Sequence, residues 1–153
     1  MASKKIAIIG KLPSKFNAPY NDNEWEIWGC NVHQDMYKIP RYDKWFDIHL
    51  YPYKFYQIPP EKLILNDTKF RQECKKVLGG NYISNSMTYM VLYAVLRAKA
   101  THIYLYGCAL NTKDEDRTKQ LQNLREILFF CKGRGIKVYS EEKNVLEEYP
   151  IYE

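Results

Sequence analysis

Residues 81–107 read NYISNSMTYMVLYAVLRAKATHIYLYG. Near the start of this stretch stand Ser84, Asn85 and Ser86, whose side-chain oxygens can cap the free N–H groups of a first helical turn. The apolar residues that follow recur at spacings of three and four, so they predict a helix with little surface facing water. The pattern then changes to a β-rich run that ends at Gly107. The stretch therefore predicts half of a βαβ unit, with a polar helix N-terminus where an anion can bind.

Length and composition predict one domain that spans residues 1–153. A chain of 153 residues with 46% hydrophobic and 27% charged residues can bury a real core, which excludes a disordered protein. The net charge of +5 is spread along the chain, so it favours anionic partners in general and argues against duplex nucleic acid. The aromatic fraction is 15%, and it indicates either an amphipathic core or a surface that stacks planar ligands.

The cysteine spacing and the N-terminal sequence indicate in which cellular compartment the protein is expected. Four cysteines stand far apart without a CxxC spacing, at positions 30, 74, 108 and 131. This spacing argues against a zinc site and favours reduced thiols in or near the core. The apolar run before Gly10 is too short for a signal peptide or a membrane span. We therefore expect a cytoplasmic protein with no metal, no cofactor and no membrane partner.

Periodicity along the rest of the chain predicts an α/β fold. Strands are predicted at residues 4–9, 24–31, 42–50, 63–65, 102–106 and 136–139, and helices at residues 68–78, 87–98 and 114–132. In the last helix, four residues are predicted to point inward: Leu121, Leu124, Leu128 and Phe129. Residues 51–60, rich in Tyr and Pro, are predicted to form a loop over one edge of the site. The tail from residue 141 is predicted to pack a short element on the sheet edge.

The loop after the first strand, residues 10–14, stands where doubly wound folds place a phosphate-contacting loop. It contains neither GxGxxG nor GxxxxGKS, so neither of these phosphate-binding patterns applies. Two interpretations stay open. Either the loop contacts a ligand through Lys11 and Ser14, or it is an ordinary turn.

Three more residues are candidates for a site. Asn31 follows the second strand, at the edge where open α/β sheets bind ligands. Asp47 and His49 are two residues apart in a predicted strand and so share one face. A carboxylate and an imidazole there can perform acid–base chemistry or bind a hydroxylated ligand. The alternative is that His49 only contacts a loop while Asp47 is solvated.

Several segments together resemble a known group of proteins. They are IGKLPS at residues 9–14, WEIWGCN at 25–31, WFDIH at 45–49, YISNSMTYM at 82–90 and IYLYG at 103–107. These segments resemble short Rossmann-like proteins of tailed phages. More distantly, they are similar to bacterial sialyltransferases that use a CMP-sugar and to pterin-pyrophosphokinase-like proteins. The likeness spans roughly residues 4–140.

The resemblance implies a Rossmann-like three-layer sandwich with a mostly parallel sheet. It also implies a nucleotide site at one edge of that sheet. It implies that Asn31 meets base or ribose and that the helix start meets phosphate. Together with the candidates found from the residues alone, the predicted nucleotide-binding residues are Gly10, Lys11, Pro13, Ser14, Asn31, Ser84, Asn85, Ser86 and Tyr89.

Two segments depart from the pattern of the group. Lys11 and Leu12 replace a small residue of the first loop, and CALN at residues 108–111 replaces an acidic continuation. The chain is also short for the acceptor-binding lid and the late histidine of the sialyltransferases, which argues against glycosyl transfer.

The residues and the resemblance support three functions. The first is a phage-type binding protein that captures a nucleotide-derived signal and counteracts host nucleotide-based immunity, in the host cytoplasm, without a catalytic residue. The second is a phosphodiesterase, nucleosidase or transferase in which His49 is the acid or base and Asp47, Glu24 or Glu26 orients it. The third is an interaction protein with a vestigial pocket. The sequence leaves open whether the protein forms a homo-oligomer.

Overall fold

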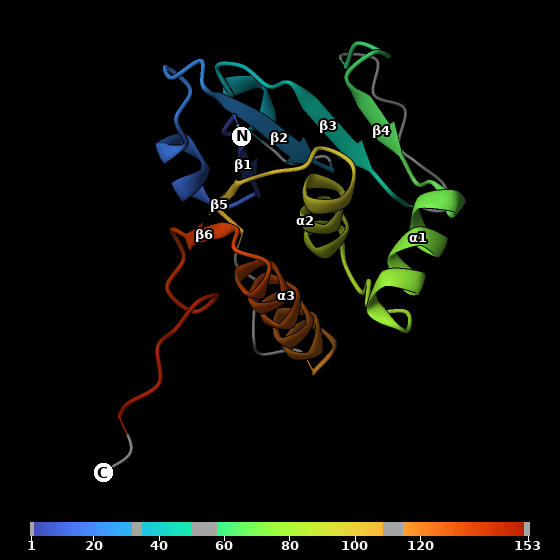
Figure 1. The fold of residues 1–153 in the computed structure, drawn as a ribbon. Helices are drawn as coiled ribbons and strands as arrows, with labels where there is room; N and C mark the ends of the chain where they lie inside the picture. Colours follow the sequence, from blue (N-terminus) through green and yellow to red (C-terminus); the bar gives the residue numbers. More distant parts are fainter. Residues whose placement is uncertain (1, 32–34, 50–57, 109–114, 152–153) are drawn as a thin grey trace.

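The structure is a computed structural model that describes residues 2–31, 35–49, 58–108 and 115–151. Within these ranges the chain forms six strands, three α-helices and two 3-10 helices (Figure 1). The elements in chain order are β1 (Lys5–Ile9), η1 (Pro13–Asn17), β2 (Trp25–Cys30), η2 (Met36–Lys38), β3 (Lys44–Asp47), β4 (Leu63–Leu65), α1 (Thr68–Leu78), α2 (Ser86–Leu96), β5 (His102–Tyr106), α3 (Glu115–Gly133) and β6 (Lys137–Ser140).

The six described strands form one sheet in the order β4-β3-β2-β1-β5-β6. Every neighbouring pair is parallel, and the central β1 aligns Ile8 with Trp28 of β2 and with Leu105 of β5. The chain runs outward from β1 to β4, then returns to the other side of β1. The strand order therefore reverses between β1 and β5, and open α/β sheets bind ligands at the carboxyl ends of the strands beside such a point. The predicted Rossmann-like α/β class is confirmed.

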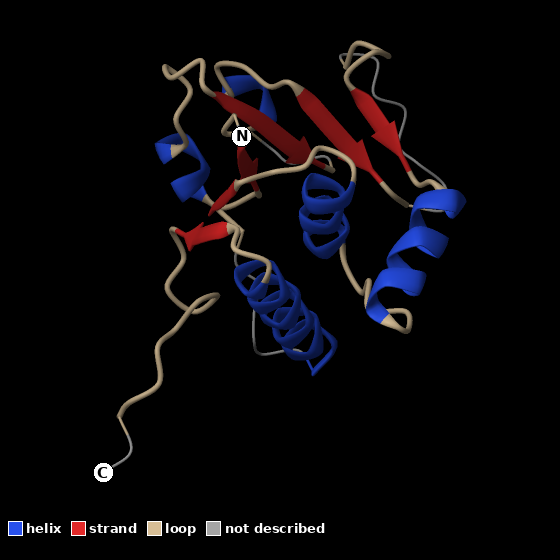
Figure 2. Ribbon diagram, viewed as in Figure 1, coloured by secondary structure: helices blue, strands red, loops and turns tan. Residues whose placement is uncertain are grey.

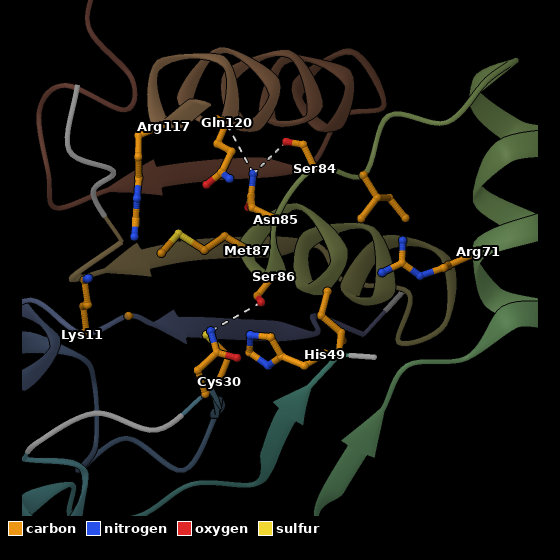
Figure 3. A pocket seen from close by; sticks show the side chains of 14 residues that line it. Lys11, Cys30, His49, Arg71, Ser84, Asn85, Ser86, Met87, Arg117 and Gln120 are labelled. Atoms are coloured by element: carbon orange, nitrogen blue, oxygen red, sulfur yellow. Dashed lines mark hydrogen bonds between the residues drawn. The ribbon is translucent and has the colours of Figure 1, made fainter. Parts of the chain in front are cut away.

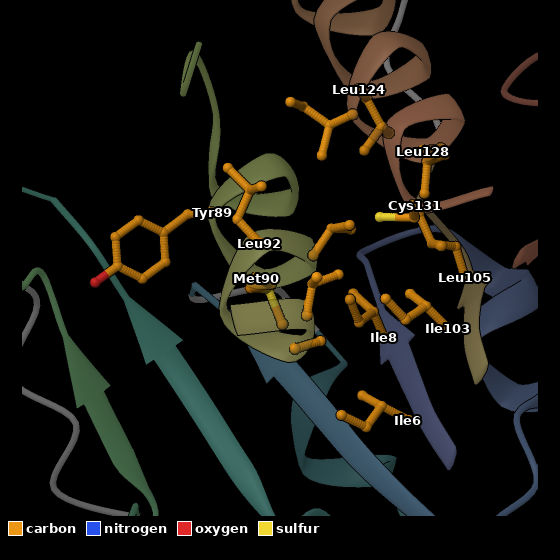
Figure 4. Close-up of a cluster of buried hydrophobic side chains, with 14 of the residues drawn as sticks. Ile6, Ile8, Tyr89, Met90, Leu92, Ile103, Leu105, Leu124, Leu128 and Cys131 are labelled. Atoms are coloured by element: carbon orange, nitrogen blue, oxygen red, sulfur yellow. The ribbon is translucent and has the colours of Figure 1, made fainter. Parts of the chain in front are cut away.

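The three α-helices lie on the same side of the sheet (Figure 2). Helix α2 is the central one, and eight of its residues are buried, as the apolar pattern predicts. Figure 4 shows the resulting core, in which Met90 and Leu92 of α2 lie among side chains of β1, β5 and α3. Burial of each large apolar side chain contributes about 1.5–3 kcal/mol. The core therefore fixes α2, and with it the N-terminal end of α2, against the sheet.

The opposite face of the sheet is covered by η1, η2 and connecting segments, which pack Tyr20, Ile39 and Ile58 on the strands. The fully buried indole of Trp45 lies directly on Gly29 of β2. A Cβ atom at Gly29 would stand 2.3 Å from the Trp45 ring. A glycine is required here because any side chain would displace the indole. The sequence patterns did not reveal η1 or η2.

Two predictions about the C-terminal part are wrong. Leu121, Leu124 and Leu128 of α3 are buried as predicted, but Phe129 is 52% exposed because it lies on the outer side of the helix. Residues 141–151 form no helix or strand, although Val145 is buried against the core.

Two other expectations concern thiols and membranes. All four cysteines are buried and free, as predicted. None of the helices in the described ranges has the length and apolar character needed to cross a membrane.

Candidate functional site

A pocket of about 520 Å³ opens at the carboxyl ends of β1, β2 and β3, a volume typical of small-molecule sites (Figure 3). Its walls come from the ends of these strands, the segment that leads into α2, and one side each of α1 and α3. The lining residues are Gly10, Lys11, Cys30, Asn31, Ile48, His49, Arg71, Ile83, Ser84, Asn85, Ser86, Met87, Arg117 and Gln120.

The N-terminus of α2 forms one wall, and its cap is built as the sequence predicts. The Asn85 side chain accepts a hydrogen bond from the Thr88 N–H at 2.9 Å, which makes Asn85 the N-cap residue. The Asn85 amide donates to the Gln120 carbonyl of α3 at 3.3 Å. These bonds set the helix start between the sheet and α3.

Asn123 of α3, 9% exposed, fixes the segment that leads into α2. Its Oδ1 accepts from the Ser84 hydroxyl at 2.6 Å, from the Ser84 N–H at 3.2 Å and from the Thr88 hydroxyl at 3.0 Å. Its Nδ2 donates to the Tyr82 carbonyl at 2.7 Å. One side chain thus satisfies four polar groups of the segment that leads into α2 and of its first turn. The Ser84 hydroxyl is therefore part of this network as well as of the pocket lining.

Asn31 has an unusual conformation at the end of β2. Its φ of 61° lies in the left-handed region, which asparagine tolerates better than most residues. Its backbone is held by its N–H donating to the Phe46 carbonyl and by its carbonyl accepting from the Trp45 indole, both at 3.0 Å. Its Nδ2 lies 3.4 Å from the Ser86 hydroxyl.

The Asn31 Oδ1 is buried and has no hydrogen-bond partner within the described structure. An unsatisfied buried acceptor costs about 1–3 kcal/mol, so few native side chains carry one. A strained backbone together with an unsatisfied acceptor is the kind of feature that clusters at ligand sites.

His49 and Asp47 form a pair at the end of β3. The His49 Nδ1 lies 2.6 Å from Asp47 Oδ1, which also accepts from the His49 N–H at 3.2 Å. Asp47 is fully buried, whereas the His49 side chain is 46% exposed at the pocket. The interpretation in which Asp47 is solvated is therefore wrong. A buried carboxylate at Nδ1 fixes the orientation of the imidazole, as in acid–base pairs of enzymes.

The charged lining is cationic. It consists of Lys11 after β1, Arg71 of α1 and Arg117 of α3, and no described lining residue is acidic. The Arg71 Nε donates to the Asn66 side chain at 2.5 Å, and its guanidinium lies 5.4 Å from the Tyr89 ring centre. With the N–H groups at the start of α2, this arrangement favours an anionic ligand.

The thiol in the pocket is not a nucleophile. Burial, with a smaller effect from the charge of Asp47, raises the pKa of Cys30 to about 12. The Cys30 thiol therefore stays protonated near neutral pH, and only a thiolate attacks or ligates a metal efficiently. No group of acidic, histidine or cysteine side chains that could bind a metal occurs among residues 2–31, 35–49, 58–108 and 115–151.

The structure brings most of the predicted site residues together. Gly10, Lys11, Asn31, His49, Ser84, Asn85 and Ser86 line the pocket, and Asp47 lies behind His49. Pro13, Ser14 and Tyr89 are not among the lining residues.

Those three residues have structural contacts elsewhere. Pro13 begins η1, and the Ser14 hydroxyl donates to Glu142 and accepts from the Gly107 N–H at 2.8 Å. The Tyr89 ring is fully buried, and its hydroxyl accepts from the Asp67 N–H at 3.1 Å.

Two other sequence expectations concern the surroundings of the pocket. Glu24 and Glu26 do not orient His49, because they lie at the amino end of β2, where they pair with Lys5 and Lys4. The loop predicted over the site covers residues 51–60. Residues 51–57 of this loop lie outside the described residues.

β1 and β5, the two strands between which the strand order reverses, lie very close to one another just after their carboxyl ends. A Cβ atom at Gly10 would stand 2.3 Å from the Gly107 carbonyl oxygen. Gly107 itself has a φ of 71°, and a Cβ there would stand 2.7 Å from the Leu12 carbonyl. Both glycines are needed for the chain after β1 to cross β5 beside the pocket.

Fold and site together define the class: a small parallel-sheet α/β protein with a cation-lined pocket at the carboxyl edge of the sheet. No protein-family model matches the chain, and neither the curated proteins nor the solved structures contain a significant match.

Proposed function

We propose that the protein binds a nucleotide or a nucleotide-derived small molecule in this pocket. The observation that carries the proposal is Asn31, whose strained backbone and unsatisfied Oδ1 lie at the pocket beside the start of α2. Because this oxygen is buried, a rotation of the Asn31 amide would be needed to bring it to a hydrogen-bond donor on a base or a ribose in the pocket. The N–H groups of α2 and the three cations favour a phosphate in the same pocket.

Capture of such a ligand is the function we propose. The likeness of the sequence to short phage proteins motivates the biological role, in which a nucleotide signal of host immunity is sequestered. Sequestration needs tight binding and no bond cleavage, so a pocket without a reactive thiol is sufficient.

Thermal unfolding with a panel of ribonucleotides and dinucleotides tests the proposal. A ligand present at 100 times its dissociation constant stabilises the protein by about 2.7 kcal/mol, which raises the unfolding midpoint of a chain of this size by about 5–10 °C. We expect at least one nucleotide to produce this shift. A panel without any shift would overturn the proposal.

Replacing Asn31 by Gly should separate binding from stability. Glycine adopts a φ of 61° without strain, so we expect the free energy of unfolding to stay within about 1 kcal/mol of the wild type. Loss of the amide should weaken nucleotide binding at least tenfold, measured by titration calorimetry.

The matched control is Lys99→Gly. Lys99 is the other described non-glycine residue with positive φ, is exposed and does not line the pocket. This variant should bind nucleotide like the wild type. Equal binding by Asn31→Gly and the wild type would remove the main support for the site.

An enzyme that acts on the same ligand class is a second candidate, and the His49–Asp47 pair is the observation that favours it. The pair has the geometry of a general acid or base held by a carboxylate, at the rim of the pocket. A phosphodiesterase, nucleosidase or transferase would use it to move a proton to or from the reacting group.

The variant His49→Gln tests the second candidate. If the protein is an enzyme, this variant should bind the nucleotide like the wild type but form product about 10²–10⁴-fold more slowly, measured by chromatography of the reaction mixture. Recovery of intact nucleotide after prolonged incubation with the wild type would reject catalysis and leave capture as the function.

A further inference from the structure

The three cations of the pocket stand at two separate places. In Figure 3, Lys11 and Arg117 extend toward one another from the β1 end and from α3, whereas Arg71 enters from α1 on the other side. Between these places in Figure 3 lie His49 and Ser86, and the Asn31 amide is 3.4 Å from the Ser86 hydroxyl, so this part of the lining is polar. A compact anion can contact one of these places, but a ligand that uses all three cations must carry negative charge at two separate positions.

Arg71 is held in place for such a contact. Its Nε is engaged by Asn66, and its guanidinium lies on the face of the buried Tyr89 ring. Within the described residues, its two terminal nitrogens make no other hydrogen bond or ion pair. A guanidinium that is oriented in advance loses little entropy when it binds a phosphate through two parallel hydrogen bonds.

The opposite place is formed by two residues far apart in sequence. Lys11 follows β1 at the point where the strand order reverses, and Arg117 lies in the first turn of α3. Neither side chain has an ion-pair or hydrogen-bond partner among the described residues. Like charges that converge without a counterion repel one another, and a bound phosphate group would offset this repulsion.

We propose that the ligand is a nucleotide with two phosphate groups on separate positions of its sugar, as in a nucleoside bisphosphate or a phosphorylated dinucleotide. One phosphate binds Lys11 and Arg117, the other binds Arg71, and the sugar and base lie along Ser86, Asn31 and His49. This inference rests on the proposed nucleotide-binding function and names its ligand class. A nucleotide with all its phosphates in one chain would leave Arg71 unused.

Two commercially available probes of similar charge test the inference. A nucleoside 3′,5′-bisphosphate and the 5′-diphosphate of the same nucleoside are titrated into the protein, each with all four bases. We expect the bisphosphate to bind at least tenfold more tightly. We also expect Arg71→Gln to weaken binding of the bisphosphate at least tenfold while it leaves binding of the 5′-diphosphate unchanged.

Two further variants make the test specific. Lys11→Gln, on an exposed loop residue, should weaken binding of both probes, because both place a phosphate there. Lys75→Gln removes a charge from the exposed side of α1, outside the pocket, and should change neither affinity. Thermal unfolding of each variant without ligand verifies that it is folded, and the equally uncharged Arg71→Met replaces Arg71→Gln if the latter unfolds.

The outcomes separate the two proposals. Equal affinities for the two probes, or equal weakening of both by the Arg71 variant, would overturn the two-phosphate inference and leave nucleotide binding intact. Failure of every nucleotide to bind the wild type would overturn both.

Discussion

Replacing Asp35 by Asn should lower the free energy of unfolding by about 3 kcal/mol. Asp35 stands at the start of η2 and pairs with Lys15, an ammonium whose side chain is fully buried. The Lys15 Nζ also donates to the Lys11 carbonyl at 3.0 Å. Removing the carboxylate leaves a buried positive charge without this counterion, and a buried charge that loses its partner is strongly destabilising.

Chemical denaturation of three variants measures this effect. Lys15→Met removes the charge and keeps an unbranched apolar chain in the same space, so it should cost less than Asp35→Asn. In the double variant, Asp35→Asn should add little to the cost of Lys15→Met, because no ammonium remains to be paired. The exposed pair Lys5–Glu24 is the control, in which Glu24→Gln should change stability by less than about 1 kcal/mol. A similar small loss for Asp35→Asn would show that the Lys15 ammonium is well solvated.

The buried pair also explains how the loop after β1 keeps its shape. This loop has no glycine-rich phosphate pattern, yet Lys11 and Gly10 line the pocket. The Lys15 ammonium donates a hydrogen bond to the Lys11 carbonyl. The Leu12 N–H donates to the Gly107 carbonyl at 3.2 Å. The loop is thus held by the buried Lys15 ammonium and by hydrogen bonds of Gly10, Leu12 and Ser14 to the end of β5.

Local sequence patterns predicted the helices and strands because helix capping, apolar periodicity and β-propensity each act over a few neighbouring residues. The apolar run of α2, its Asn85 cap and the β-rich run after it each appear within a few residues of sequence. The position of Asn31 at the pocket followed from the general rule for parallel sheets, whereas His49 was expected inside a strand that in fact ends at Asp47. The error at Phe129 arises because the buried face of α3 carries Leu124, Ile127, Leu128 and Cys131. The helical turn of 3.6 residues places Phe129 outside this face, although its apolar side chain suggests burial.

Long-range contacts could not be predicted in the same way. Arg71, Arg117 and Gln120 reach the pocket only because α1 and α3 lie beside the start of α2. The burial of Lys15 contradicts the usual exposure of lysine, so sequence reasoning assigns it to the surface. Glu24 and Glu26 are far from His49 because they lie at the amino end of β2, and only the carboxyl ends of the strands face the pocket.

Asn123→Ala should have the largest effect on the pocket itself. This substitution removes the acceptor for Ser84 and Thr88 and the donor for the Tyr82 carbonyl. We expect a loss of about 2–3 kcal/mol in the free energy of unfolding, since each unsatisfied group costs on the order of 1 kcal/mol. Because the segment that leads into α2 loses its anchor on α3, nucleotide binding should weaken at least tenfold at a temperature where the variant is folded.

Two substitutions determine whether this loss arises from the network or from the cavity left by the side chain. Thr88→Val keeps the volume and removes one of the four hydrogen bonds, so it should cost about 1 kcal/mol and leave binding nearly unchanged. Asn123→Asp keeps the acceptor and the shape but places a carboxylate against the Tyr82 carbonyl in place of a donor. We expect it to weaken binding almost as much as Asn123→Ala, because it releases the same end of the segment. Binding at the wild-type level by both Asn123 variants would mean that the sheet and the Asn85 cap suffice to hold the N-terminus of α2 at the pocket.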